Sequence, residues 1–414
     1  MEGVERKVLD NIDIAGMLDF IKDLVKTPSY GGKESDAQNL VNNKLEEFGF
    51  TIDKWEIDFD KIKEHPEFSM SFDRKEGVGL VGILGEGKKS IILCGHVDTV
   101  APGEEEHWDS PPLELIIEDK RIIGRGVADM KGGLAAMIYG AKLLQETALR
   151  GNVVVACVVQ EETCEGLGTR TLVEDSGSEP DWGVLGEPTN LNVSRGQRGR
   201  LEMRVVAHGK SAHAASPQLG ENAIYVASRL VFGLELLAGQ LGDDDFLGTG
   251  SLAVTEISSR AGSRNAIPDR CTLIIDRRLT LGENETKALA EVQRVIAREG
   301  VSAEVTVPSY ETATYTGHAC KTREFYPAWV IAADHPLVEA AVQAAQAQLK
   351  RRPHITRWGF STEGVYTAGE ANIPTVGFGP GREELAHTSD EHVRVDDVYA
   401  AAEVYARLAA LLLE

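Results

Sequence analysis

Hydrophobic and polar residues follow two different periods along the first half of the chain. Segments with apolar residues every three or four positions, the spacing of an amphipathic helix, are 14–26, 34–48 and 131–147. Continuous apolar runs typical of buried strands are 78–84, 90–95, 152–159 and 182–186. Because helical and strand-like segments alternate, the pattern predicts a mainly parallel sheet covered by helices, which is an α/β fold.

The pattern changes near residue 195. A strand, a helix, two strands, a helix and a last strand are predicted, in that order, at 200–208, 221–238, 251–259, 271–279, 284–299 and 302–307. This β-α-β-β-α-β order is that of the ferredoxin-like split motif, which is sufficient for a small separate domain. The first pattern then returns, with a helix, a short strand and a long helix at 336–350, 374–378 and 395–413.

The length of the chain agrees with two domains, because 414 residues exceed one ordinary hydrophobic core. We predict that residues 1–194 and 310–414 form the two parts of one α/β domain. The smaller ferredoxin-like domain, residues 195–309, is inserted between them.

Charge and cysteine content exclude several classes of protein. The formal net charge is −22, and no run of Lys or Arg offsets it, so we expect no nucleic-acid and no membrane partner. Five cysteines without C-x-x-C spacing argue against a disulfide framework and against a zinc site made of thiolates. The charged N-terminus resembles no signal peptide, and no apolar stretch reaches 18 residues, so we predict a cytoplasmic protein.

Five short segments carry side chains that bind hard metal ions. They are GHVD with His96 and Asp98, GRGVADMKGG with Asp129, QEETCEG with Glu161 and Glu162, LGEPT with Glu187, and AHTSDEH with His387. Each candidate is predicted to lie just beyond the C-terminal end of a parallel strand, where open α/β sheets place their ligand crevice. Two histidines and several carboxylates without thiolates suit Zn(II), Mn(II) or Co(II).

Each segment by itself also has a purely structural interpretation. An H-x-D triplet such as that of His96 and Asp98 occurs often by chance, and Asp129 is placed where an N-cap aspartate would be. The neighbouring acids Glu161 and Glu162 would be unremarkable on a solvated loop, but inside a cleft they need a cation to remain charged together. The five segments taken together favour a metal site.

In this order, the motifs GHVDTV, GRGVADMKGG, QEETCEG, GEPT and AHTSDEH resemble those of the M20 metallopeptidases. That superfamily includes acetylornithine deacetylase, succinyl-diaminopimelate desuccinylase, aminoacylase and glutamate carboxypeptidase. The segments FYPAWVIAADHP and GQRGRLEM are most similar to YgeY-type hydrolases. The resemblance covers nearly the whole chain and implies a dinuclear metallohydrolase whose inserted domain is a lid that forms a homodimer.

The resemblance also implies a role for each candidate. Two divalent metal ions per subunit are expected, with Zn(II) first and Mn(II) or Co(II) as alternatives. Asp129 would bridge them; the remaining ligands would be His96 and Glu187 at one ion, and Glu162 and His387 at the other. Asp98 would orient His96, and Glu161 would be the general base for a water activated by both ions.

In the lid, the segment GKSAHAASPQLGENA implies that His213 reaches the active site of the partner subunit and stabilises the oxyanion. Asn265 and Arg278 match lid positions that contact substrate. Two alternatives stay open, because His213 could belong to a surface loop and Arg278 could pair with acids of the lid. The sequence departs from the family at Phe360–Glu363, where many relatives have a Thr-Asp-Ala type segment, so inherited specificity does not extend there.

The leading hypothesis is a hydrolase that cleaves an amide-type C–N bond in a small N-acyl amino acid or a dipeptide-like substrate. A second hypothesis keeps the same dinuclear site but changes the bond to that of a carbamoyl group or an aryl amine. A third is a catalytically silent metal-binding protein on the same scaffold. The presence of Glu161 together with all five ligands argues against the third hypothesis.

Overall fold

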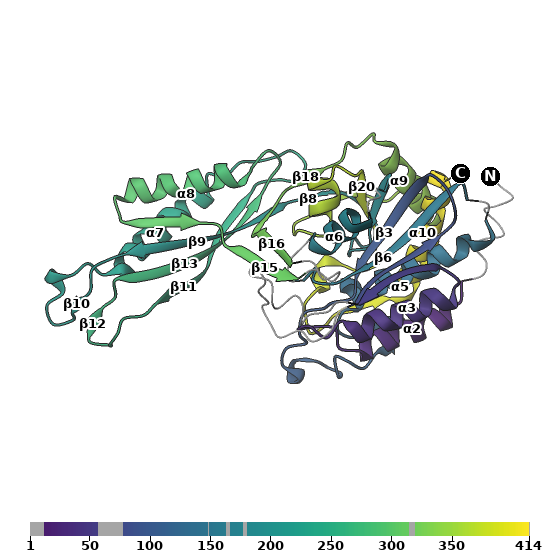
Figure 1. The fold of residues 1–414 in the computed structure, drawn as a ribbon, viewed down its shortest axis with the longest axis horizontal. Helices are drawn as coiled ribbons and strands as arrows, with labels where there is room; N and C mark the ends of the chain where they lie inside the picture. The colour runs from purple at the N-terminus through teal and green to yellow at the C-terminus, as the bar shows by residue number, and fades with distance from the viewer. Residues whose placement is uncertain are drawn as a thin grey trace.

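The computed structural model describes residues 12–56, 78–147, 149–162, 166–176, 180–313 and 319–413. The molecule is elongated, with a large helix-covered β-sheet at one end and a smaller sheet at the other (Figure 1). Among the described residues, none of the helices is both long enough and apolar enough to span a bilayer.

The larger sheet has a parallel centre and antiparallel edges. Its strands are β1 (Thr51–Glu56), β2 (Val78–Leu84), β3 (Lys89–His96), β6 (Gly151–Val158), β7 (Trp182–Leu185), β8 (Val193–Gln197), β18 (Trp329–Val330), β19 (Ile355–Trp358) and β20 (Thr375–Gly377). Their order is β1-β2-β6-β3-β7-β20-β8-β18, and β19 also pairs with β8. The four neighbours β6, β3, β7 and β20 are mutually parallel, whereas β1, β2 and β18 are antiparallel to their neighbours. The predicted α/β class is confirmed, with parallel pairing concentrated at the centre of the sheet.

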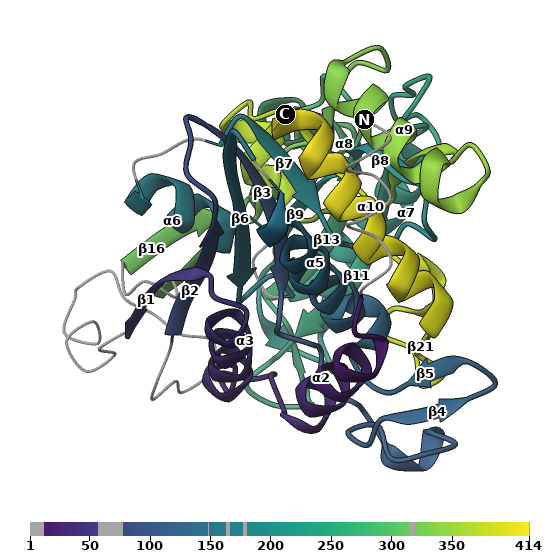
Figure 2. The ribbon, with the colours of Figure 1, turned by 90° about the vertical axis from the view of Figure 1, so that its right-hand side faces the viewer.

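Helices cover both faces of this sheet. They are α2 (Ile14–Lys26), α3 (Ser35–Glu47), α5 (Gly132–Lys142), α6 (Leu167–Ser176), α9 (Pro336–Leu349) and α10 (Val395–Leu413). Helices α5 and α10 pack side by side on one face, and α6 lies on the other (Figure 2).

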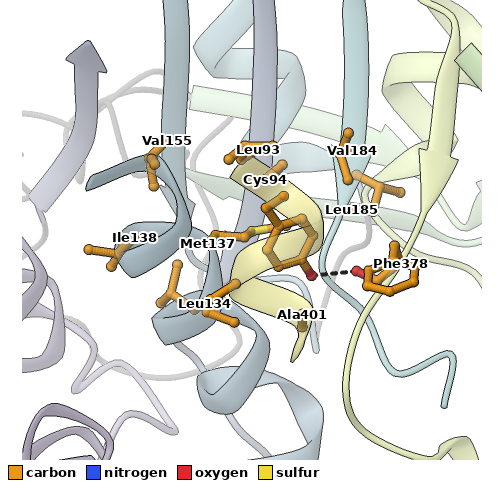
Figure 3. Packing of buried hydrophobic residues seen from close by; sticks show 14 of the residues in the cluster. Leu93, Cys94, Leu134, Met137, Ile138, Val155, Val184, Leu185, Phe378 and Ala401 are labelled. Atoms are coloured by element: carbon orange, nitrogen blue, oxygen red, sulfur yellow. Dashed lines mark hydrogen bonds between the residues drawn. The ribbon is translucent and has the colours of Figure 1, made fainter. Parts of the chain in front are cut away.

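The core between α5, α10 and the sheet fixes two segments that carry predicted ligands. Leu93, Val155 and Val184 from three neighbouring strands are completely buried there (Figure 3). A Cβ atom on Gly140 of α5 would lie 2.4 Å from the carbonyl oxygen of Ala402 in α10, so only glycine permits this close approach of the helices. The hydroxyl of Tyr405 in α10 donates to the carbonyl oxygen of Phe378, just after β20. Helix α5, which follows Asp129, and the end of β20 are therefore held by one packed layer.

The second sheet has the predicted β-α-β-β-α-β succession. Its elements are β9 (Gly199–His208), α7 (Ala223–Ala238), β11 (Ser251–Ser259), β13 (Arg270–Leu279), α8 (Glu285–Glu299) and β14 (Ala303–Thr306). The strands lie in the order β11-β13-β9-β14, and the short β17 (Phe325–Tyr326) also pairs with β9. All these pairs are antiparallel, and the first and third strands of the motif are adjacent at the centre. This arrangement is that of the ferredoxin-like motif.

Each sheet has its own hydrophobic cluster. Strand β8 of the large sheet ends at Gln197, and β9 of the second sheet begins at Gly199. The first predicted boundary, after residue 194, lies close to this change of sheet. The second, after residue 309, falls within β15 (Ser309–Ala313), and β17 (Phe325–Tyr326) still pairs with β9 before the chain returns to the large sheet at β18. The domain limits stay a prediction.

Three smaller pairings complete the described chain. Strands β10 (Ala212–His213) and β12 (Ala266–Ile267) pair at the tip of the molecule that is farthest from the large sheet (Figure 1). Strands β15 (Ser309–Ala313) and β16 (Ala319–Arg323) form a hairpin. Strands β4 (Ile116–Glu118), β5 (Arg121–Ile123) and β21 (His392–Arg394) form a three-stranded sheet.

Candidate metal centre and active site

Four of the five predicted segments follow the parallel strands of the large sheet. His96 is the last residue of β3, and Glu161 and Glu162 follow β6. Glu187 follows β7, and His387 lies in the chain after β20. Because parallel neighbours end at the same edge of a sheet, these side chains meet there. The prediction from the apolar runs is confirmed for these four segments.

Asp129 reaches the same place by a different route, and the expectation that it follows a parallel strand is wrong. The strand before it is β5, which belongs to the three-stranded antiparallel sheet. Asp129 lies between this strand and α5, after Gly126, whose φ of +82° is in the left-handed region that favours glycine. A strand of three residues, two of them apolar, as in β5, does not reveal from sequence which sheet it joins.

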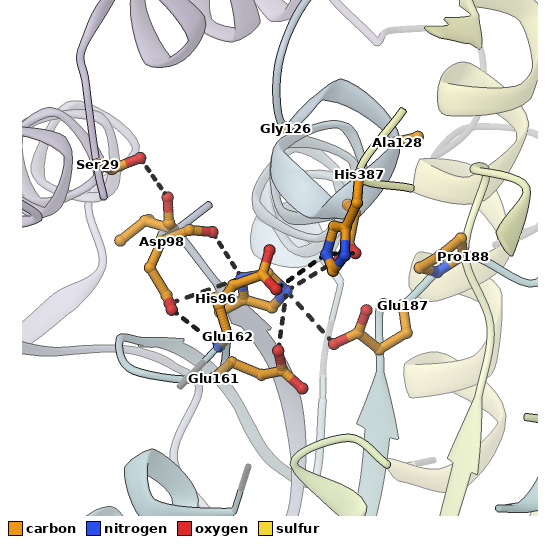
Figure 4. Close-up of polar contacts among 12 residues, drawn as sticks. Ser29, His96, Asp98, Gly126, Ala128, Glu161, Glu162, Glu187, Pro188 and His387 are labelled. Carbon is orange, nitrogen blue, oxygen red and sulfur yellow. Dashed lines mark hydrogen bonds and ion pairs between the residues drawn. The ribbon is translucent and has the colours of Figure 1, made fainter. Parts of the chain in front are cut away.

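The side chains from these segments converge on one small region (Figure 4). The Nε2 atom of His96 lies 3.2 Å from Oδ1 of Asp129 and 3.5 Å from Oε1 of Glu187. The Nε2 atom of His387 lies 3.3 Å from Oδ2 of Asp129 and 3.0 Å from Oε2 of Glu162. Asp129 therefore turns one carboxylate oxygen toward each histidine, which is the arrangement expected of a bridging ligand.

In the part of the chain that the structure describes, two groups of three side chains bring their ligand atoms within 4.8 Å of one another. One group is His96, Glu161 and Glu187, and the other is Asp129, Glu162 and His387. Glu161 belongs to the first group because its Oε2 lies 3.9 Å from the Nε2 atom of His96. These distances are compatible with two roles for Glu161, a metal ligand or a base that lies beside the ligands.

The orientation of His96 is fixed by Asp98, two residues further along the chain and just beyond β3. Its Nδ1 atom lies 2.9 Å from the backbone carbonyl oxygen of Asp98 and 3.6 Å from the Asp98 carboxylate. A carbonyl oxygen only accepts, so Nδ1 carries a hydrogen atom and Nε2 is the atom that faces the other site residues. The Asp98 carboxylate accepts instead from the backbone N–H of Glu162 at 3.1 Å. Asp98 orients His96 mainly through its carbonyl group and also ties β3 to the Glu161–Glu162 turn.

The electrostatics of the site show an excess of buried negative charge. Burial lowers the pKa of His96, but the nearby Glu187, Asp129 and Glu161 outweigh it and hold this pKa well above its ordinary value. Hydrogen bonds to Asp129 and Glu162 raise the pKa of His387 to about 10. Burial and the neighbouring acids likewise raise the pKa of Glu187. Four carboxylates face two imidazoles, so added positive charge at this place would stabilise the ionised carboxylates.

The donor set fits divalent metal ions. Imidazole nitrogens and carboxylate oxygens are ligands of Zn(II), Mn(II) and Co(II). The Oε1 atom of Glu162 is buried and has no hydrogen-bond partner among the described residues. A buried charged oxygen without a partner is costly, and a cation would satisfy it.

His213 and Asn265, two of the residues predicted in the lid, lie far from this centre within the chain (Figure 1). His213 lies in β10 at the far tip, beside Asn265, whose carbonyl oxygen accepts from Ala214. The side chain of Arg278 donates to Asp276 in the same strand at 2.8 Å. The pairing of Arg278 with an acid of the lid, an alternative that the sequence left open, is therefore present in this structure.

Two buried carboxylates near the centre were missed by the sequence reasoning. Glu363, in the segment that departs from the family, accepts hydrogen bonds from the backbone and hydroxyl groups of Thr169 at the start of α6. Glu391, inside the AHTSDEH motif, accepts hydrogen bonds from the loop that carries Asp129. Their partners are 194 and at least 262 residues away in the chain, so no local pattern in the sequence reveals them.

Comparisons with known proteins agree with this geometry. The family model for peptidase family M20/M25/M40 matches residues 92–411. The chain is 36% identical to the uncharacterized protein YgeY of Escherichia coli over 396 residues, covering 95% of this chain and 94% of that protein. It is 30% identical over 287 residues to succinyl-diaminopimelate desuccinylase 2 of Shewanella loihica, covering 66% of this chain and 71% of that enzyme.

Among solved structures, the fold is similar to that of the YXEP protein of Bacillus subtilis, a dinuclear metal-binding peptidase of the M20 family. The TM-score is 0.67 at 16% identity, with 97% of this chain and 98% of that chain covered. At this identity the likeness concerns the fold alone.

Proposed function

Because the chain belongs to peptidase family M20/M25/M40 and is a hydrolytic enzyme, we propose that it cleaves an amide-type C–N bond with two divalent metal ions. We propose a small N-acyl amino acid or a dipeptide-like molecule as its substrate. The observation that carries the proposal is the placement of Asp129, whose two carboxylate oxygens lie 3.2 and 3.3 Å from His96 and His387. The relationship to a desuccinylase supports the N-acyl substrate class.

The contacts support one assignment of the ligands to the two ions. Asp129 would bridge the ions, with His96 and Glu187 completing one site and Glu162 and His387 the other. We propose Zn(II), because two imidazoles with carboxylates are a common zinc set; Mn(II) and Co(II) bind similar donors. When bound, the ions supply polarisation of the substrate carbonyl group and a lower pKa for water at the site.

Glu161 is proposed as the general base. Its side chain is largely buried beside His96, yet the bridging position belongs to Asp129. A carboxylate held there can accept a proton from the attacking water and deliver it to the leaving nitrogen. In this role Glu161 moves protons, and its neighbour Glu162 binds metal.

Removal of metal is expected to abolish hydrolysis. Treatment with EDTA followed by dialysis should remove more than about nine-tenths of the activity, because both the carbonyl and the water lose their activation. Zn(II), Mn(II) or Co(II) should restore it. The hydrolysis rate should be measured with N-acyl amino acids, dipeptides, carbamoyl compounds and aryl amides. Full activity after chelation would contradict a metal-dependent reaction.

The same panel separates the competing hypotheses. Turnover confined to carbamoyl compounds or aryl amides would move the proposal to that bond. Absence of turnover on every class, in protein that has bound two ions per chain, would favour the silent metal-binding scaffold.

We also propose that two chains form a homodimer through the smaller domain. Helix α7 exposes Tyr225, Phe232 and Leu236 with 71, 68 and 62% of their surface accessible, and their spacing puts them on one helix face. Strand β11 is the edge of its sheet among the described residues, and its Ile257 is 53% exposed. An apolar helix face beside an open strand edge is typical of an interface between copies.

This dimer would bring His213 to the active site of the partner subunit. His213→Ala should lower kcat far more than it raises KM, because an oxyanion contact strengthens in the transition state.

Mixing inactive His213→Ala chains with inactive Glu161→Gln chains should then restore about a quarter of the wild-type rate, if subunits exchange randomly. The reason is that each mixed dimer holds one site with both Glu161 and a partner's His213. A mixture that stays inactive contradicts a role in the partner.

The interface itself provides the control. Phe232→Lys should give monomers by light scattering and remove the recovery of activity on mixing. Ile117→Lys replaces a comparably exposed apolar residue of β4, outside the smaller domain, and should leave the dimer unchanged.

A further inference from the structure

Glu391 is a completely buried carboxylate next to the metal centre that has no role in the proposed chemistry. It directly precedes β21, which pairs with β5 so that His392 lies opposite Ile123. The next residues after β5 form the loop that leads to Asp129. Strand pairing therefore places Glu391 against this loop, and the backbone N–H of Gly124 donates to its carbonyl oxygen at 3.2 Å.

Both carboxylate oxygens of Glu391 accept hydrogen bonds from that loop. Oε2 accepts from the backbone N–H of Gly126 at 2.9 Å. Oε1 accepts from the backbone N–H groups of Ala128 and Asp129 at 3.0 and 3.2 Å. Three backbone groups within four residues are thus held by one side chain, so the path of the loop is defined up to Asp129 itself.

The charge of Glu391 is balanced by Arg125 from the same loop. Nη1 of Arg125 lies 2.7 Å from Oε2 of Glu391, and both side chains are nearly inaccessible to solvent. The guanidinium group also lies over the ring of Trp108, 5.0 Å from its centroid, and donates to the carbonyl oxygen of Pro102. Each carboxylate oxygen of Glu391 thus accepts from two donors, Oε2 from the Gly126 N–H and the Arg125 guanidinium group and Oε1 from the Ala128 and Asp129 N–H groups.

We propose that Glu391 is a positioning residue for the metal centre. By holding the backbone N–H groups of Ala128 and Asp129, it sets the direction in which the two oxygens of Asp129 face His96 and His387. It also lies four residues after His387, so a single side chain links the segments that carry the bridging carboxylate and one histidine. This inference rests on the proposed metal-dependent function and adds a residue to it.

A purely stabilising role would give a different result. A buried Arg–Glu pair can hold a fold together without affecting any ligand. The chain contains such a pair in the smaller domain, where Nη2 of Arg277 lies 2.8 Å from Oε1 of Glu283. Glu283 also accepts from the backbone N–H of Thr280 at 3.0 Å. This pair resembles that of Arg125 and Glu391 in charge, burial and backbone contact, but it belongs to the other sheet.

The test is a titration of metal-free protein with Co(II), followed by absorption and by calorimetry. Glu391→Gln keeps the shape but replaces one acceptor oxygen by an amide donor that faces other donors. We expect Co(II) binding to weaken about 10- to 100-fold, as is typical when an outer partner of a ligand is lost. Glu283→Gln, the matched control, should lower Tm and leave the Co(II) affinity and spectrum unchanged.

Glu391→Asp provides a second variant, which keeps the charge but shortens the reach to the loop. If Glu391→Gln does not fold, weaker Co(II) binding by folded Glu391→Asp supports the proposal. Wild-type Co(II) affinity in either folded variant overturns it and leaves the proposed function intact. Failure of the wild-type chain to bind Co(II) would instead contradict the proposed function itself.

Discussion

Replacing Glu161 by glutamine is expected to lower kcat about 10²- to 10⁴-fold, the usual contribution of a general base, while both metal ions stay bound. The amide has the size of the carboxylate but cannot accept the proton of the attacking water. The two carboxylate oxygens of Asp129, the proposed bridge, lie against His96 and His387. Loss of the Glu161 charge should therefore leave this bridge in place. The measurements are kcat at saturating substrate and the metal content of the dialysed protein.

The neighbouring residue is the matched control for this variant. Glu162→Gln makes the same chemical change one position along the chain, at the carboxylate 3.0 Å from His387. It should lose metal from that site, so that added metal partly restores its rate. Glu161→Gln that loses one ion, with activity recovered at high metal concentration, would make Glu161 a ligand and remove it from the proton transfer.

The sequence predicted most of the secondary structure because its apolar periods are strong. The helix predicted at 14–26 is α2, and the strands predicted at 78–84 and 251–259 are β2 and β11 with the same bounds. Helix α2 buries one apolar stripe, β2 buries neighbouring residues on both of its faces, and β11 packs Leu252 and Val254 partly against the smaller core. These contacts are what the apolar period records. The ferredoxin-like order was predictable for the same reason.

Strand direction was less accessible to sequence reasoning. The run at 78–84 was expected in a mainly parallel sheet, but β2 pairs antiparallel with both β1 and β6. A strand that is buried on both faces has the same apolar sequence in either direction. The direction depends on the connections, and those are set by long-range packing.

The candidate site was predictable where its residues follow parallel strands, as His96 and Glu187 do. The supporting residues were not. Glu391 lies within a motif that the sequence made prominent, yet its contacts are to backbone N–H groups of the loop around Ala128. Backbone groups occur at every position, so a side chain that binds them leaves no complementary residue in the sequence. Asp98 is similar, because its main contact with His96 uses the carbonyl group that every residue has.

Asp129→Asn should have the widest effect on the site, because one side chain is proposed to serve both ions. The amide keeps the shape of the side chain but leaves a single neutral acceptor between His96 and His387, which lie 3.2 and 3.3 Å from its two terminal positions. Binding at both sites should weaken together, by more than the 10- to 100-fold expected for an outer partner. Hydrolysis should become undetectable, and dialysed protein should contain less than one ion per chain.

Asp98→Asn is the control that separates two effects of Asp129→Asn, the loss of a bridging ligand and the loss of a negative charge near His96. It removes the same charge from a carboxylate 3.6 Å from Nδ1 of His96 but keeps the carbonyl group to which that nitrogen donates at 2.9 Å. It should therefore bind two ions with moderately reduced affinity. Calorimetric titration with Zn(II) distinguishes the variants by stoichiometry, since a bridging residue affects both ions and an orienting residue affects mainly one. If Asp129→Asn lost one ion and bound the second with wild-type affinity, Asp129 would be a ligand of a single ion, and two independent sites would replace the bridged pair.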